Sequence, residues 1–201
     1  MTSPIPHILG IGGTLRAGSS SEQALRLALR AAERLGATIE IIAAPDLDFP
    51  AYQPETAASV EAAERLVAAA RRADGIVVAT PGYHGGMSGL IKNAIDYMQA
   101  LADDPSPYLQ GKAVGCIVTA AGAQAGGSTL ASLRATVHAL RGWPTPLGVA
   151  INSATPQFDR DGDAVDPKVG AQLEALAGEV VGFQHFRRRA FSPEPVEAVP
   201  A

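Results

Sequence analysis

A loop near the N-terminus combines residues that could bind a phosphate group. In GIGGTLRAGSSSE, residues 10–22, an apolar run ends and a helical pattern begins. Side-chain hydroxyls, the free N–H groups of a helix start and one guanidinium can all bind an anion there. The predicted phosphate ligands are Thr14, Arg16, Ser19, Ser20 and Ser21. One arginine suits a phosphate monoester, and the alternative is that Ser20 or Ser21 only caps the helix.

The same loop departs from two common nucleotide-binding patterns. Leu15 stands where the dinucleotide motif G-x-G-x-x-G needs its third glycine, and Glu40 lies too far inside the second predicted strand to bind a ribose. Gly13 and Gly18 have the spacing of a P-loop, but Ser19 replaces the lysine of that motif. We therefore do not expect hydrolysis of nucleoside triphosphates.

A second stretch could lie against a flat ring. ATPGYHGGMSGLIKNAIDYM, residues 79–98, follows the most strand-like segment and has four glycines within eight residues. Missing side chains let a ligand approach the backbone closely, as a heterocycle with polar edges would need. We expect Tyr83 to pack on such a ring and His84 to contact its edge, while Ser88 caps the next helix. The alternatives are a subunit contact for Tyr83 and plain solvent exposure for His84.

A third connection, TAAGAQAGG at residues 119–127, is expected to be a bare loop before a helix that starts at Ser128. Its N–H groups could stabilise negative charge on a bound ring. The alternative for this segment is an ordinary turn.

Neither metal nor thiol chemistry is expected. The single cysteine, Cys116, lies in the buried-strand pattern VGCIVT, where a thiol stays protonated and unreactive. His7, His138 and His185 lack the spacing of metal ligands.

Strand-like and helical patterns alternate along the chain. Strands are predicted at 7–12, 38–43, 75–80, 112–120 and 146–152, and helices at 21–36, 59–73, 88–101, 128–141 and 167–186. This alternation predicts a doubly wound α/β fold with a five-stranded parallel sheet and helices on both faces. Ligands of such sheets bind beyond the carboxyl ends of the strands, where the strand order reverses. The three connections described above lie at such ends.

Length and charge restrict the class of protein further. With 201 residues, 47% of them hydrophobic, the chain is expected to form one domain at 1–186 and a flexible, proline-rich tail at 187–201. A net charge of -4 argues against nucleic-acid or anionic-membrane partners. Without a signal peptide or an apolar run of about 20 residues, the expected location is the cytoplasm.

The motifs resemble those of a known family. GGTLRAGSS resembles G-[ST]-x-R-x-x-S, and ATPGYHGGMSGLIKNAIDY resembles P-x-Y-x-x-x-x-S-G-x-L-K-N-x-[IL]-D, in the NAD(P)H-dependent FMN reductase family. The resemblance spans 7–186 and is nearest to flavin reductases that serve two-component monooxygenases. It implies a flavodoxin-like fold with strand order 2-1-3-4-5, one FMN per subunit, NADPH or NADH as electron donor, and homodimers or homotetramers with the flavin near a subunit interface.

The resemblance also implies a role for each matching residue. The residues expected to bind FMN are Thr14, Arg16, Ser19, Ser20, Ser21, Pro81, Gly82, Tyr83, His84, Gly85, Thr119, Ala120, Ala121 and Gly122. By matching position, Thr14, Arg16, Ser19 and Ser21 would hold the phosphate, although many relatives have asparagine at the position of Ser21. Pro81, Gly82, Tyr83 and His84 would line the isoalloxazine, with residues 119–122 beyond it. No catalytic side chain is expected, because hydride transfer to flavin is chemistry of the cofactor.

Other functions remain open at this point. The acceptor could be a quinone, an azo dye or an oxyanion such as chromate instead of free flavin. A non-enzymatic electron carrier like flavodoxin is a further alternative, although the modest charge argues against the charged docking face of such carriers. A flavin-binding regulatory protein is the third.

Overall fold

Three apolar segments form the centre of a parallel sheet. The computed structural model describes residues 5–191. The central strands are β1 (His7–Gly12), β3 (Gly75–Tyr83) and β5 (Ala113–Ala120), and β5 is buried along its whole length. Such strands read as continuous apolar runs because both of their faces are covered.

The remaining strands extend this sheet on either side. The order is β2-β1-β3-β5, with β6 and β7 both paired to the outer edge of β5, and all of these pairs are parallel. The outer strands are β2 (Thr38–Ile42), β6 (Trp143–Pro144) and β7 (Val149–Asn152). In the order of the predicted strands this is 2-1-3-4-5, so the predicted doubly wound sheet is confirmed.

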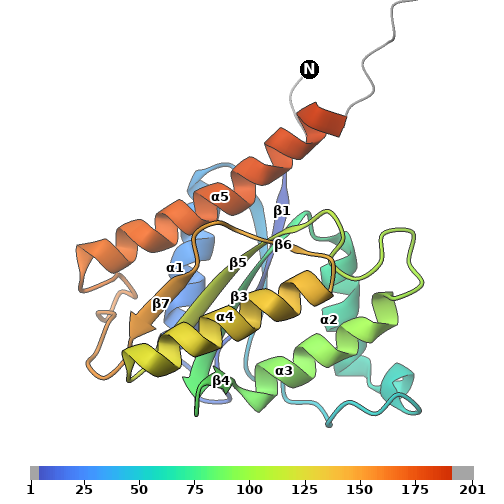
Figure 1. The fold of residues 1–201 in the computed structure, drawn as a ribbon, viewed down its shortest axis with the longest axis horizontal. Coiled ribbons are helices and arrows are strands. Elements are labelled where there is room, and N and C mark those ends of the chain that lie inside the picture. The colour runs from blue at the N-terminus through green and yellow to red at the C-terminus, as the bar shows by residue number, and fades with distance from the viewer. Residues whose placement is uncertain (1–4, 192–201) are drawn as a thin grey trace, which may run out of the picture.

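Helices cover both faces of the sheet (Figure 1). One apolar cluster packs α1 (Ser20–Arg34) and α5 (Pro167–Phe191) on one face. A second cluster covers the other face with α2 (Glu61–Arg72), α3 (Gly89–Asp96), α4 (Ala123–Ala139) and the 3-10 helix η2 (Tyr97–Leu101). Another 3-10 helix, η1, comprises Ala57–Ser59. Among residues 5–191, no helix combines the length and the apolar character that crossing a bilayer demands.

Pairing aligns the carboxyl ends of four strands along one edge. Gly12 of β1 pairs with Ala79 of β3, Pro81 pairs with Thr119, and Ala120 pairs with Asn152 of β7. The chain passes from β1 outward to β2 and returns to β3 on the opposite side of β1, so the order reverses between β1 and β3. The loops that follow β1, β3, β5 and β7 therefore meet near this reversal.

Two predicted elements have different bounds. The strand predicted at 146–152 is shortened to β7 at Val149–Asn152, and the short strand β6 at Trp143–Pro144 was not predicted. Pro144 and Pro146 lack the N–H that one continuous ladder would need. The helix predicted at 167–186 continues to Phe191. Residues 192–201, the rest of the predicted tail, lie outside the described residues.

The helix predicted at 88–101 also differs. Its α-helical part ends at Asp96, and the 3-10 helix η2 continues to Leu101. The tighter turns of η2 place Tyr97 against Phe49 and Tyr52, with ring centroids 4.9 and 5.2 Å away. This aromatic packing anchors the loop that follows β2.

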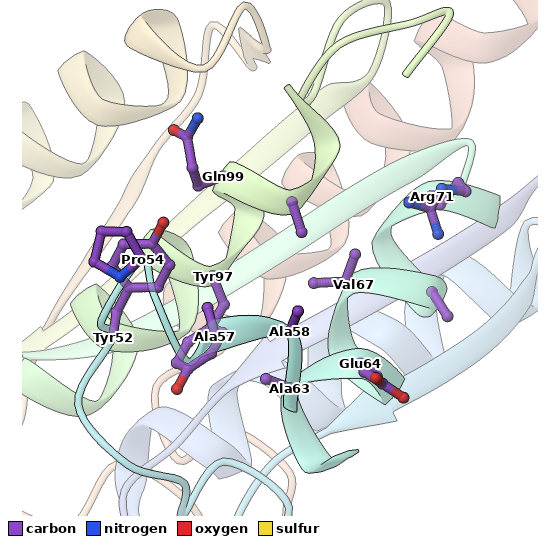
Figure 2. A pocket seen from close by; sticks show the side chains of 12 residues that line it. Tyr52, Pro54, Ala57, Ala58, Ala63, Glu64, Val67, Arg71, Tyr97 and Gln99 are labelled. Atoms are coloured by element: carbon purple, nitrogen blue, oxygen red, sulfur yellow. The ribbon is translucent and has the colours of Figure 1, made fainter. Parts of the chain in front are cut away.

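A hollow of about 560 Å³ lies between η1, α2 and η2 (Figure 2). Tyr52 and Pro54 stand at one end and Arg71 at the other, with small apolar side chains between them. The Arg71 guanidinium donates to the Asp104 carboxylate at 2.7 Å, so its charge is already paired. This hollow therefore offers no free cation to a phosphate.

Candidate functional site

One hollow at the carboxyl edge of the sheet brings the three predicted loops together. Its volume is about 270 Å³. The lining residues are Thr14, Arg16, Ser19, Ser20, Ser21, Pro81, Gly82, Tyr83, Thr119, Ala120, Ala121 and Ser153. All the predicted site residues except His84, Gly85 and Gly122 are among them, and Ser153 is the one addition.

The start of α1 forms a polar cup on one side of this hollow. Ser19 is the N-cap, and its Oγ accepts a hydrogen bond from the Glu22 N–H at 3.3 Å. The alternative that Ser20 or Ser21 caps the helix is therefore wrong, and Ser21 instead places its Oγ 3.3 Å from that of Ser19. The first N–H groups of a helix have no partner within it, so they can bind an anion in the cup.

Glu22 stabilises the loop that forms this cup. Its buried carboxylate accepts from the Gly18 N–H at 2.9 Å and from Arg26 Nε at 2.9 Å. Arg26 balances the negative charge, so that charge does not repel an anion as an unpaired carboxylate would. Glu22 is not among the predicted site residues, although Ser19-x-x-Glu22 has the spacing of a capping box.

Arg16 supplies the positive charge of the cup. Its backbone N–H donates to Thr14 Oγ1 at 3.1 Å, and the Thr14 hydroxyl is 3.2 Å from the Arg16 carbonyl oxygen. These contacts hold the loop in a turn. The exposed Arg16 side chain forms no ion pair with any residue in the range 5–191, so its guanidinium is free to bind an anionic ligand.

The glycine-rich segment after β3 is a hairpin. Tyr83 pairs with Gly86 of the antiparallel strand β4 (Gly86–Met87) across a two-residue turn. His84 and Gly85 form this turn with φ of 53° and 84°, which is the conformation of a type I′ turn. The turn carries both residues away from the hollow lining, while Tyr83 stays at its rim with 56% of its surface exposed.

Packing against α4 explains why residue 82 is glycine. A Cβ at Gly82 would lie 2.9 Å from Thr129 Oγ1 and 3.1 Å from the Ala120 Cβ. The missing side chain thus lets α4 approach β3, which is a second reason for glycine beside the predicted approach of a ring. Thr129 Oγ1 is buried and has no hydrogen-bond partner among the described residues.

Two predictions about helix starts have opposite outcomes. Ser88 caps α3 as predicted, with its Oγ accepting from the Ile91 N–H at 3.3 Å. The bare loop predicted at 119–127 is wrong, because α4 begins at Ala123 and only residues 121–122 connect it to β5. Ser128 lies within α4, where its hydroxyl donates to the Gln124 carbonyl at 2.9 Å.

A second hollow adjoins the first. It has a volume of about 500 Å³ and shares Thr14, Arg16 and Tyr83 with the smaller hollow. Leu15 and Leu90 add apolar surface to it. Sites for small organic ligands have volumes of roughly 300–1,000 Å³, so the two adjoining hollows have the size of such a site.

The chemistry of the remaining groups limits what the site can do. Burial raises the pKa of the Cys116 thiol to about 12, so this residue is no nucleophile. Within residues 5–191, no His, Cys, Asp or Glu side chains gather in a group that could hold a metal ion. The site offers hydrogen-bond donors, one guanidinium and an aromatic rim.

The fold and the site together define a class of proteins. These are doubly wound α/β proteins in which a polar cup, able to bind an anion, adjoins a hollow at the point where the strand order reverses. Residues 6–156 match the family described as NADPH-dependent FMN reductase, and the chain belongs to this family. The predicted enzyme class, an NAD(P)H-dependent flavin oxidoreductase that uses FMN, is thereby confirmed as that of the family.

Individual relatives agree with this assignment. An NAD(P)H-dependent FMN reductase of Pseudomonas aeruginosa is 33% identical over 176 residues, which cover 84% of this chain and 92% of that protein. A quinone reductase of Escherichia coli is 31% identical over 195 residues, covering 91% and 96%.

A solved structure supports the fold. The flavoenzyme NAD(P)H:(acceptor) oxidoreductase FerB of Paracoccus denitrificans superimposes with a TM-score of 0.75 at 22% identity, covering 90% of this chain and 98% of that one. The predicted flavodoxin-like fold is confirmed.

Proposed function

We propose that this chain binds FMN in the two adjoining hollows and uses it to oxidise NADH or NADPH. The phosphate would lie in the cup formed by Thr14, Arg16 and the start of α1, and the ring would lie between Tyr83 and the end of β5. The observation that carries this proposal is the meeting of the unpaired Arg16 and the serine hydroxyls with three backbone connections in one hollow.

The donors present fit a phosphate monoester. Arg16 lacks an acidic partner among the described residues, and the α1 start adds N–H groups and the positive end of a helix dipole. The short α4 connection brings a second helix start beside the ring, where its N–H groups would stabilise negative charge.

The bound flavin would supply the hydride chemistry, and the protein would supply binding and orientation. Tyr83, exposed at the rim, would cover one edge of the ring. The apolar surface of Leu15 and Leu90 in the larger hollow would receive the nicotinamide or the acceptor. None of these roles requires a side-chain acid, base or nucleophile.

For the acceptor we propose free FMN, whose reduced form would then serve a partner monooxygenase. The family description and the P. aeruginosa relative support flavin as the acceptor. A second candidate keeps FMN bound and reduces a quinone or an azo compound, which the E. coli relative and an azoreductase of Bacillus at 31% identity support. The homo-oligomer with flavin near its interface and the cytoplasmic location stay predictions.

Variants of Arg16 test the binding mode. In Arg16→Gln, FMN affinity should fall at least about tenfold, because a hydrogen bond to a charged group contributes roughly 1.5–3 kcal/mol. Riboflavin, which lacks the phosphate, should bind wild type and variant equally. Arg160→Gln changes an exposed arginine outside both hollows and is the matched control. Equal losses for FMN and riboflavin would contradict phosphate binding by Arg16.

Kinetics test the reaction. Steady-state oxidation of NADH and NADPH should be measured with free FMN, with a quinone and with an azo dye as acceptors. Turnover that rises with free FMN supports the first candidate, and turnover that rises only with the quinone or the dye supports the second. In anaerobic stopped-flow experiments, an enzyme is reduced directly by NAD(P)H. A protein that binds FMN without this reduction is an electron carrier.

A further inference from the structure

Ser153 lines the candidate site from a fourth connection, the one between β7 and α5. Its backbone N–H donates to the Ala120 carbonyl at 2.9 Å, which extends the pairing of β5 with β7 beyond Asn152. The residue is therefore held directly beside Ala120 and Ala121. The sequence signal for it was available, because a hydroxyl residue follows the fifth predicted strand at the same edge.

The side chain of Ser153 is available to a ligand. It is half-buried, and its hydroxyl has no hydrogen-bond partner among residues 5–191. Alternation along β7 puts Ser153 on the same face as the buried Ile151, which packs in the cluster of α1 and α5. On β5, Thr119 follows Ile117 of that cluster by two residues. Thr119 and Ser153 thus share the face on which α1 begins.

Strand spacing separates Ser153 from the phosphate cup. The order β1-β3-β5-β7 places three interstrand spacings between the end of β1 and Ser153, about 14 Å at roughly 4.8 Å each. Thr14 and Arg16 follow β1 and Ser153 follows β7, so within the hollow that they share, a ring over β3 and β5 would lie nearer to Ser153 than a phosphate held beside the end of β1. The ring, expected over β3 and β5, would lie between them.

We propose that the Ser153 hydroxyl donates a hydrogen bond to an acceptor atom at the edge of the flavin ring farthest from the phosphate. This inference rests on the proposed function, since it assigns one more contact to the same ligand. Ser153 is then a positioning residue that orients the ring against β5. The ribityl chain and the phosphate receive no contact from it.

Three variants isolate this hydroxyl. Ser153→Ala removes it, while Ser153→Thr and Ser153→Val have matching shapes and differ only in the hydroxyl. Ser132→Ala on the exposed face of α4 is the control. Affinities for FMN and riboflavin are measured by quenching of flavin fluorescence, and visible absorption spectra of bound FMN are recorded for each variant.

The proposal expects Ser153→Ala and Ser153→Val to bind FMN and riboflavin about fivefold more weakly, which is the effect of one neutral hydrogen bond. Ser153→Thr should bind both flavins like wild type. The absorption bands of FMN should shift in the alanine and valine variants, because the lost contact is to the ring itself.

Other outcomes would overturn the proposed hydrogen bond between Ser153 and the ring. Weaker binding of FMN alone would place the contact at the phosphate, and an equal loss without a spectral shift would place it at the ribityl chain. Unchanged affinities would mean no contact. Wild-type protein that binds neither flavin would refute the proposed function itself, before any variant is compared.

Discussion

A substitution of Gly82 distinguishes two explanations for the glycine at this position, packing against α4 and close approach of a ring. In Gly82→Ala the new Cβ would lie 2.9 Å from Thr129 Oγ1, 3.1 Å from the Ala120 Cβ and 3.4 Å from the Ala125 carbonyl oxygen. The first distance is too short for a real contact, so the Thr129 side chain, α4 or β3 must shift. Overpacking of this kind costs about 1–3 kcal/mol, which lowers the melting temperature of a chain of this size by several degrees.

The measurement is urea or thermal unfolding of protein free of flavin. If packing against α4 explains the glycine, the free energy of unfolding falls in the absence of any ligand. Thr129→Ala removes the closest atom, so the double variant should lose less stability than the sum of the two single variants, by about 0.5 kcal/mol or more. Gly127→Ala on α4 is the control for a glycine without close neighbours, since a Cβ there meets nothing within 4 Å, and it should be at least as stable as wild type.

The opposite result would refute this reasoning. If Gly82→Ala unfolds like wild type but no longer binds FMN, the missing side chain serves the approach of the ring. If Thr129→Ala leaves the loss unchanged, the shift occurs at Ala120 instead.

Three further predictions concern the rest of the fold. Cys116 should resist alkylation in the native protein at neutral pH and react on unfolding, because it is buried and burial raises its pKa; rapid native labelling would contradict its burial. Burial raises the pKa of Glu40, but hydrogen bonds from Arg72 and His7 outweigh it and hold the pKa below 4.5. Glu40→Gln should therefore destabilise the protein above pH 4.5, and the difference in melting temperature should shrink as the pH falls through the folded-state pKa; a pH-independent difference would exclude this linkage. Ser19→Ala should lower the free energy of unfolding by about 1 kcal/mol, because it removes the N-cap of α1. An equal loss in Ser20→Ala would contradict the assignment of Ser19 as the N-cap.

Local patterns allowed much of the site to be predicted. The phosphate cup depends on residues within one short loop, Thr14 to Ser21, whose hydroxyls and helix start are neighbours in the sequence. The capping role of Ser88 depends on its own helix in the same way. Predictions were wrong where glycines were taken as breaks. Gly126 and Gly127 continue α4, although each glycine disfavours a helix by about 1 kcal/mol, because α4 packs against β7 at Ala150.

The sequence by itself determined the alternation of strands and helices, the edge of the sheet at which the candidate site lies and the residues of the polar cup at the start of α1. These follow from periodicity, capping and loop composition, which act between residues close together in the chain. Only the tertiary structure decided the turn that removes His84 from the hollow lining, the contact of Gly82 with Thr129 and the position of Ser153 beside Ala120. Each of these depends on how strands pair or how a helix packs on them. The contacts of Gly82 and Ser153 join segments that are far apart in the sequence, and the turn at His84 follows from the pairing of β3 with β4.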